Sequence, residues 1–168
     1  STGHQAIAEY LQGLYADYGI TLNVSSQEWG TFLNTRKDGN YSVARNGWLG
    51  DYNDPISFLD MWITGSGNND CQFGKGAYET YAGYSYDDKT GLTWAQSYDA
   101  LIAQVKASKD PVERFALMHK AENVLMSTGA ITPIYYYVDI FMISPTIEGF
   151  FSSPLGFKYF MYASIAAE

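Results

Sequence analysis

Residues 44–55 read ARNGWLGDYNDP, and this stretch carries the most information about the fold and function of the sequence. We expect it to begin as a half-buried strand and to turn at the glycines on either side of Trp48 and Leu49. Glycine lets a backbone approach a bound molecule closely, where a Cβ would clash. Trp48 offers a flat apolar face, and Asp51 offers a carboxylate to a cation such as an amino terminus. The stretch therefore predicts a site for a small charged ligand rather than a reaction centre.

The composition indicates a globular protein whose partners are not nucleic acids. The 168 residues are enough for one compact domain, or for a large piece of a bigger protein. Hydrophobic residues make up 46% of the chain and charged residues 17%, which excludes a disordered chain. The formal net charge of −8 argues against nucleic acid, because that partner requires a basic surface. Aromatic residues, at 17%, suit wet binding clefts and interfaces.

Cysteine usage and hydropathy exclude two further classes. Cys71 is the only cysteine, so an internal disulfide and a multi-cysteine zinc site are excluded. It has no basic neighbour within two residues, so we expect an unreactive thiol. No stretch reaches the roughly 18 apolar residues of a membrane span. There is also no signal peptide before the first expected helix, and this abrupt start predicts a chain cut from a longer precursor.

The first 48 residues read as helix, strand, helix and strand. Apolar residues at helical spacing predict a helix that ends at Gly19, and alternation predicts a strand over residues 20–24. Helical spacing returns over residues 27–37, and alternation returns over residues 41–48. Short connections between such elements are typical of an α/β fold, and they favour parallel pairing of the two strands.

The next part of the sequence predicts three helices and an irregular segment. Pro55 begins a short helix that ends near residue 62, and residues 64–91 follow without a period. So long a loop is typical of a functional segment or a contact surface. Thr93 has capping-box spacing to Gln96, and Asp110 repeats the device with a proline at the first helical position. The buried stripe of this last helix should consist of Phe115, Met118, Ala121, Val124 and Leu125.

The remaining 38 or so residues read as strands. Residues 131–138 and 140–144 have strand character, and residues 159–162 suggest a last edge strand. Within the first of these, Tyr136 should point to one face and its two tyrosine neighbours to the other. At least one face then needs partners for hydroxyl groups.

Patterns for catalysis and metal binding are weak. The two histidines, His4 and His119, have no second histidine nearby, and His119 fits a helix surface. The acidic run from Asp51 lacks the glycine and glutamate of a calcium loop, and no G-x-S-x-G elbow occurs. The glycines between residues 65 and 76 do not form a phosphate-binding loop. Asp51 and Asp54 leave a glycoside hydrolase open, although Asp54 before a proline is typical of a helix cap.

The three arginines differ in how easily a structural role explains them. Arg114 lies in the first turns of a helix with a polar face, where we expect it to be solvated. Arg36 ends a helix, where a cation suits the helix dipole. Arg45 lies in the middle of an expected strand, so it must be paired or must point into a cleft. Trp29 would by default be a core residue of its helix.

Three motifs occur in an order that resembles a known family. They are QEWxTFLxTR at 27–36, VARxGWxxDYNxP at 43–55 and IxPIYYYV at 131–138. They resemble the C-terminal lobe of oligopeptide-binding proteins of ABC importers, the family 5 extracellular solute-binding proteins, through nearly the whole chain. The resemblance implies an α/β fold: the C-terminal lobe of a two-lobed, cluster C type periplasmic-binding-protein-like fold, with a mixed sheet and flanking helices. Residues 1–168 would form this single lobe.

The resemblance implies a receptor that closes around an extended peptide and delivers it to a membrane permease, without catalysis and without a cofactor. Asp51 would pair with the α-amino group of the peptide, and Gly47 and Leu49 would present backbone groups to its main chain. A zwitterionic peptide needs a carboxylate, one or two cations and aromatic pockets, and the chain supplies all three.

The resemblance assigns the other ligand-binding positions to pockets and to the far end of the groove. Trp29 and Trp48 would line side-chain pockets, and Arg36 would face a pocket or a ligand carboxylate. Arg45 and His4 would lie at the carboxyl end of the ligand groove. Tyr137 completes the predicted set.

Two departures and several alternatives accompany this interpretation. Leu49 stands where some relatives carry a cysteine, and the N-terminal lobe of such receptors, with both hinge strands, is missing. The receptor would lie in the periplasm or be lipid-anchored on the outer face of the membrane, with the permease and the missing lobe as partners. Alternatives are a receptor of the same family for nickel, haem or a sugar, and a carbohydrate-binding module with Tyr and Trp platforms. An acid hydrolase would need two carboxylates that face one pocket.

Overall fold

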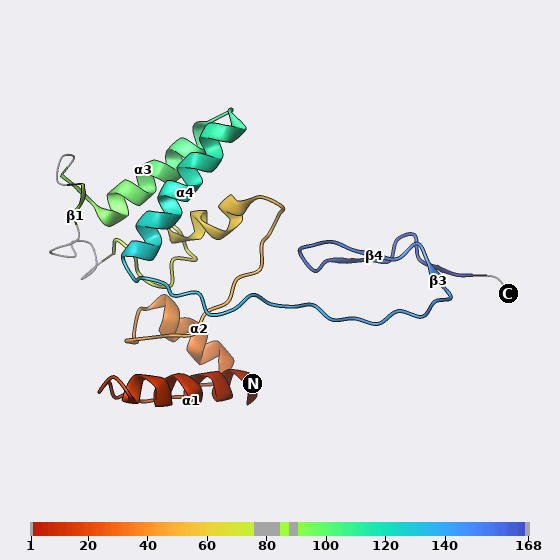
Figure 1. Cartoon of the computed structure of the whole chain (residues 1–168), viewed down its shortest axis with the longest axis horizontal. Helices are drawn as coiled ribbons and strands as arrows, with labels where there is room; N and C mark the ends of the chain where they lie inside the picture. Colours follow the sequence, from red (N-terminus) through yellow and green to blue (C-terminus); the bar gives the residue numbers. More distant parts are fainter. Residues whose placement is uncertain (1, 76–84, 88–90, 167–168) are drawn as a thin grey trace.

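The computed structural model describes residues 2–75, 85–87 and 91–166, and three parts are distinct in it (Figure 1). Helices α1 (Thr2–Ala16) and α2 (Trp29–Lys37) form the N-terminal part. Helices α3 (Trp94–Ala107) and α4 (Pro111–Ser127) pack together in a helical body. Residues 132–166, which we call the C-terminal arm, run away from this body and fold back on themselves.

Both predicted N-terminal helices are confirmed. Helix α1 ends shortly before Gly19, which has a left-handed φ of 74° that suits glycine. The carboxylate of Glu28 caps α2 by accepting the N–H of Thr31 at 3.1 Å. Arg36 and Lys37 occupy the last turn of α2, where positive charge complements the helix dipole.

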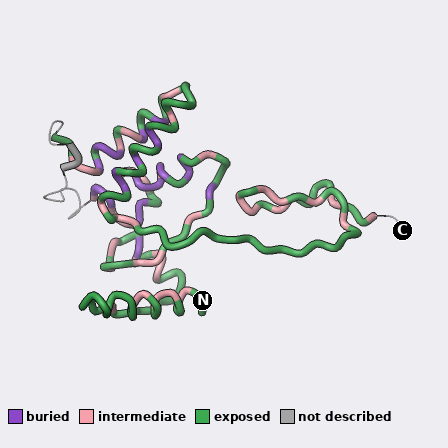
Figure 2. The backbone as a smooth tube through the Cα atoms, in the orientation of Figure 1, coloured by how far each residue is buried: buried purple, intermediate pink, exposed green. Residues whose placement is uncertain are grey.

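The core lies between α3, α4 and two short 3₁₀ helices, η1 (Pro55–Phe58) and η2 (Asp60–Trp62). Its largest fully buried hydrophobic side chains are Tyr98, Ile102, Val105, Val124 and Leu125. The Tyr98 hydroxyl donates to the carbonyl of Leu59 at 2.5 Å, and its ring meets Phe73 edge to face at 5.7 Å. Most buried residues lie in this helical body (Figure 2). The sequence predicted a single helix from Pro55 to residue 62, and the structure has the two 3₁₀ helices η1 and η2 in its place.

The predicted capping box is confirmed in full at the start of α3 and only in part at the start of α4. Thr93 and Gln96 form a complete capping box at 3.0 and 3.2 Å, next to a ladder of β1 (Ser85–Asp87) and β2 (Leu92–Thr93). Asp110 caps α4 by accepting the N–H of Val112 at 2.9 Å. Glu113 instead accepts the hydroxyl of Ser108, so α4 has no reciprocal box. Phe115 is 51% exposed, against prediction, whereas the other four residues of the α4 stripe are buried.

The C-terminal arm ends in two short antiparallel ladders. Strand β3 (Ile147–Glu148) pairs with β6 (Ser164–Ile165), and β4 (Phe151–Ser152) pairs with β5 (Lys158–Tyr159). A Cβ at Gly149 would lie 1.9 Å from the carbonyl oxygen of Tyr162, so the turn requires glycine there. The edge strand predicted over residues 159–162 coincides with β5 only at Tyr159.

Four other strand predictions are wrong. In the part of the chain that the structure describes, residues 20–24, 41–48, 131–138 and 140–144 join no β-ladder. The three described ladders are all antiparallel, so the parallel pair expected in the first 48 residues is absent from them. Alternation of apolar and polar residues predicts an extended segment with one apolar and one polar face. A strand also needs a neighbouring segment that pairs with its N–H and C=O groups.

Two further observations concern the described residues as a whole. None of the helices among residues 2–75 and 91–166 is long and apolar enough to cross a membrane. In the same ranges, no three His, Cys, Asp or Glu side chains gather as metal ligands. The irregular segment predicted over residues 64–91 falls partly outside the described residues.

Candidate functional site

Five of the nine predicted ligand-binding residues lie within residues 44–51, which we call the site segment. This segment connects α2 with η1 and is fixed near both ends by hydrogen bonds. At one end, Nη1 of Arg36 donates to the carbonyl of Arg45 at 3.3 Å. At the other end, the N–H of Asp51 donates to the hydroxyl of Ser57 at 2.9 Å. The site segment is thus held by α2 on one side and by η1 on the other.

Trp48 and Asp51 share one anchor. The indole N–H of Trp48 donates to the carbonyl of Ser57 at 2.7 Å, and the half-buried ring packs against the core. Asp51 is exposed, and within the described residues its carboxylate has no hydrogen-bond or ion-pair partner. A carboxylate that is open to solvent and an aromatic ring three residues earlier are thus both held through Ser57.

At the other end of the site segment, Arg45 is the centre of a polar cluster. Its guanidinium donates to the hydroxyl of Tyr137, which lies 92 residues further along the chain. A Cβ at Gly47 would lie 2.5 Å from that hydroxyl oxygen. The positive charge of Arg45, followed by desolvation and the N-terminal amino group, lowers the pKa of His4. The structure thus brings Arg45, Gly47 and Tyr137 together, and His4 lies within reach of the charge of Arg45.

Arg36 has a different environment from the one predicted. It is buried and forms an ion pair with Asp70, with 2.8 Å between Nη2 and Oδ2. Its guanidinium also lies 5.3 Å from the centre of the Phe32 ring. Arg36 therefore faces Asp70 and the backbone of Arg45 rather than an open pocket, and it ties α2 to the site segment.

Trp29 and Leu49 are exposed apolar side chains. Trp29 is 57% exposed at the start of α2, 6.1 Å from the Phe32 ring between centroids, so its default assignment to the core is wrong. Leu49 is 67% exposed. Both side chains are open to solvent, and neither forms part of the hydrophobic core.

Gly50 serves internal packing. It is buried, and a Cβ there would lie 3.0 Å from the ring of Phe58 and 3.4 Å from Leu155. The space beside this glycine is therefore taken by Phe58 and by the turn between β4 and β5. The prediction that this glycine leaves room for a ligand is therefore wrong for Gly50.

Several polar groups that fix the site segment and the helices next to it were not predicted from the sequence. Arg114, which we expected to be solvated, binds both carboxylate oxygens of Asp54 at 2.8 and 3.1 Å. The predicted cap at Asp54 is confirmed, because Oδ1 accepts the N–H of Ile56 at 3.0 Å. Ser57 and Asp70 were not singled out. A serine or an aspartate in a loop has many possible partners, so no sequence signal identified them.

A cavity of about 260 Å³ lies between the C-terminal part of α1 and the residues that follow this helix, and none of the site residues lines it. It is lined by Gln12, Ala16, Gly19, Ile20, Thr21, Leu22 and Asn23. The candidate site is therefore an open surface of the described chain rather than this cavity.

Comparisons with known proteins show what the chain is similar to in sequence and in fold. Residues 1–70 match the family model of the bacterial extracellular solute-binding proteins, family 5 Middle. The chain is 36% identical over 132 residues to the periplasmic oligopeptide-binding protein OppA of Salmonella typhimurium, which covers 79% of this chain and 21% of that protein. It is 32% identical over 156 residues to the dipeptide-binding protein DppE of Bacillus subtilis, with coverage of 92% and 25%.

A solved structure extends the similarity to the fold. The unliganded open form of the periplasmic murein tripeptide binding protein MppA matches with a TM-score of 0.69 at 29% identity. The match covers 89% of this chain and 25% of that one, and it confirms the predicted α/β fold of periplasmic binding proteins. The chain is homologous to the family 5 bacterial extracellular solute-binding proteins, and it spans about a quarter of the length of these relatives.

Proposed function

We propose that this chain is the C-terminal lobe of a peptide-binding receptor that serves an ABC importer. The observation that carries the proposal is the exposed carboxylate of Asp51, which has no partner among the described residues, at one end of the site segment, with the Arg45 cluster at the other. A short peptide is a zwitterion, so it needs an anion for its amino group and a cation for its carboxylate. The relatives named for oligopeptide and dipeptide binding support the same substrate class.

The site segment also limits the span of a ligand that uses both ends. Asp51 and Arg45 are six residues apart, so their backbones are separated by at most ~20 Å even if the segment is fully extended. An extended peptide of up to about six residues has a similar length. Trp48 and the exposed Trp29 and Leu49 would then contact side chains of the peptide, and His4 and Tyr137 would support Arg45 near its carboxylate.

The proposal includes an opposite lobe that completes the site. The C-terminal arm exposes many large apolar side chains, among them Tyr136 at 95% and Met142 at 98%. Surfaces of this kind rarely stay uncovered in a soluble protein. We therefore assign the arm to the contact with the rest of the receptor, which lies in the periplasm or is lipid-anchored outside the cell. Closure of the two lobes would bury the peptide, and the closed receptor would dock on the permease.

Replacement of Asp51 by Asn in the full-length receptor tests the central assignment. Asp51→Asn keeps the shape of the side chain and removes its charge. We expect the affinity for short peptides with a free amino terminus to fall by about 10-fold or more, because a charge-assisted hydrogen bond is lost. Isothermal titration calorimetry measures this change.

Asp17→Asn is the matched control, because Asp17 is an exposed carboxylate outside the site segment and has no ion pair within the described residues. Its affinity for peptide should equal that of the parent. Equal affinities for Asp51→Asn and the parent would contradict the assignment of Asp51.

A further inference from the structure

Ser57 connects both main residues of the site segment to the core. It is only 2% exposed and lies in η1. Its carbonyl accepts the indole N–H of Trp48 at 2.7 Å, and its hydroxyl accepts the backbone N–H of Asp51 at 2.9 Å. One buried serine therefore fixes an aromatic ring with its main chain and a backbone amide with its side chain.

The helix that carries Ser57 is itself held firmly. Asp54 caps η1 through the N–H of Ile56, and its carboxylate binds the guanidinium of Arg114 on α4 through two hydrogen bonds. Ile56 is buried in the core. A displacement of Ser57 would therefore disturb a capped turn, an ion pair and a core contact at the same time. Positions fixed in this way are suited to orient a binding group in advance.

We propose that Ser57 is a positioning residue for the recognition of a ligand amino group. Its hydroxyl holds the backbone of Asp51, whose side chain is exposed, while its carbonyl holds the ring of Trp48. The inference rests on the proposed function, because it assigns the amino group of a peptide to Asp51. Without the hydroxyl, Asp51 would move among several conformations, and ligand binding would have to select one of them.

Substitution of Ser57 separates this role from a general effect on the fold. Ser57→Ala removes the acceptor for Asp51 and leaves the carbonyl that holds Trp48. In the full-length receptor, we expect the affinity for trialanine to fall by about 10-fold, because one hydrogen bond and its pre-ordering are lost. The affinity for N-acetyl-trialanine, measured by competition at high concentration, should not change. A general loss of structure would weaken both peptides.

Ser66→Ala is the matched control. Ser66 also accepts a backbone N–H with its hydroxyl, that of Asn68 at 3.1 Å, but it lies outside the site segment. Its affinities for both peptides should equal those of the parent. Ser57→Thr keeps the hydroxyl and should restore the preference for the free amino group.

The outcomes distinguish the inference from the proposed function. If the parent prefers trialanine and Ser57→Ala keeps that preference, or loses affinity for both peptides equally, the positioning role is contradicted. If the parent does not prefer trialanine, the proposed function fails and the inference fails with it. Hydrogen exchange of the parent gives a test without a variant. The Asp51 amide should be protected, and free exchange at this amide would contradict the inference.

Discussion

At the scale of single residues, Asp54 shows how one carboxylate can stabilise both a turn and a tertiary contact. It caps η1 and binds Arg114 from α4 at 2.8 and 3.1 Å. In Asp54→Asn the side chain still caps η1, but the ion pair is lost. We expect the free energy of unfolding at pH 7 to fall by about 1 kcal/mol, because this pair is only partly exposed and bidentate. Urea unfolding followed by tryptophan fluorescence measures the change.

Asp110→Asn is the control for the cap alone. Asp110 caps α4 through the N–H of Val112 and has no ion pair within the described residues. Its substitution should change the free energy of unfolding by only a few tenths of a kcal/mol, since Asn and Asp are similar N-caps. Equal losses in the two variants would show that the charge of Asp54 contributes nothing.

The same pair has a defined pH dependence. Burial alone would raise the pKa of Asp54, but hydrogen bonds from Arg114 and Ile56 and the charge of Arg114 lower it overall. A lowered pKa in the folded state stabilises the fold above the unfolded pKa, and this contribution is lost as the pH falls through the folded pKa. The difference between the parent and Asp54→Asn should therefore be constant from pH 5 to pH 8 and should decrease below about pH 4. A constant difference down to pH 2 would contradict the lowered pKa.

The sequence indicated the charged and aromatic residues of the candidate site but not the residues that hold them in place. The charged and aromatic residues at positions 45, 48 and 51 are unusual in so short a stretch, and their neighbours identified the family. The resemblance assigned Arg36 to a pocket or a ligand carboxylate. Its partner, Asp70, lies in a loop without a pattern, so no sequence signal indicated the ion pair. Ser57 was not identified from the sequence, since a serine near a helix start has several possible partners and nothing in the pattern indicates Trp48 and Asp51.

At the scale of elements, the helices were predictable and the strands were not. Helix ends depend on local residues, such as Thr93 and Gln96 at the start of α3 and the glycine after α4. A strand depends on a partner that is distant in sequence. Residues 131–144 have strand character, yet they pair with nothing in the described part of the chain. We propose that they form strands only with the other lobe of the proposed receptor.

Hydrogen exchange tests this interpretation of the arm. No backbone hydrogen bond involves residues 132–143 in the described part of the chain. In the chain alone, we expect their amides to exchange within seconds, whereas amides in the middle of α3 and α4 are protected by the core. In the full-length receptor, the same amides of the arm should be protected. Protection of the amides of the arm in the monomeric chain alone would contradict the assignment of the arm to the contact with the opposite lobe.

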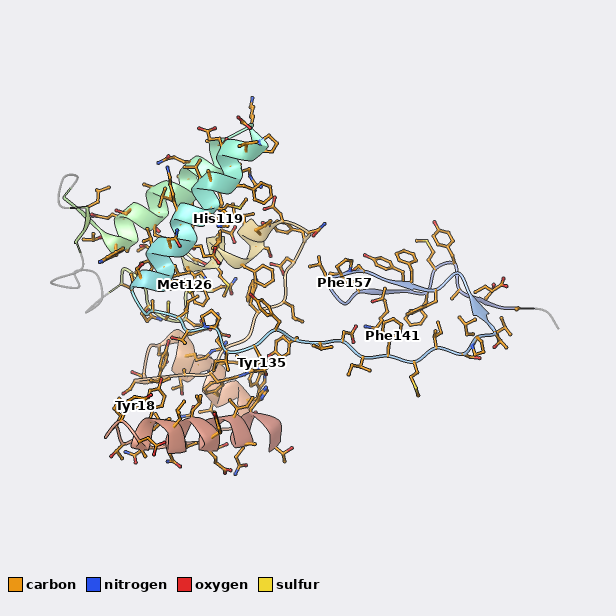
Figure 3. The ribbon with its side chains drawn as sticks, in the orientation of Figure 1. Tyr18, His119, Met126, Tyr135, Phe141 and Phe157 are labelled. Carbon is orange, nitrogen blue, oxygen red and sulfur yellow. The ribbon has the colours of Figure 1, made fainter. Side chains whose placement is uncertain are left out.

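At the scale of the whole molecule, a helical body with one core carries an exposed arm that it cannot bury. Phe141 and Phe157 lie along the arm, well away from His119 and Met126 of α4, while Tyr135 lies where the arm leaves the body (Figure 3). The prediction of one lobe over residues 1–168 remains a proposal, and the arm favours a division near residue 131, where the core ends. The arm still contacts the site segment through Tyr137 and Leu155. A movement of the arm would therefore change the positions of Arg45 and Gly50 in the candidate site.

Calorimetric titration of the full-length receptor with trialanine and with N-acetyl-trialanine shows whether the receptor recognises the amino group of a peptide through Asp51. We expect trialanine to bind and acetylation to weaken binding by about 10-fold or more, because the positive partner of Asp51 is removed. Equal affinities for the two peptides would contradict recognition of the amino group. Binding of neither peptide, with a sugar or a metal complex bound instead, would contradict the peptide as the substrate and leave the fold unchanged.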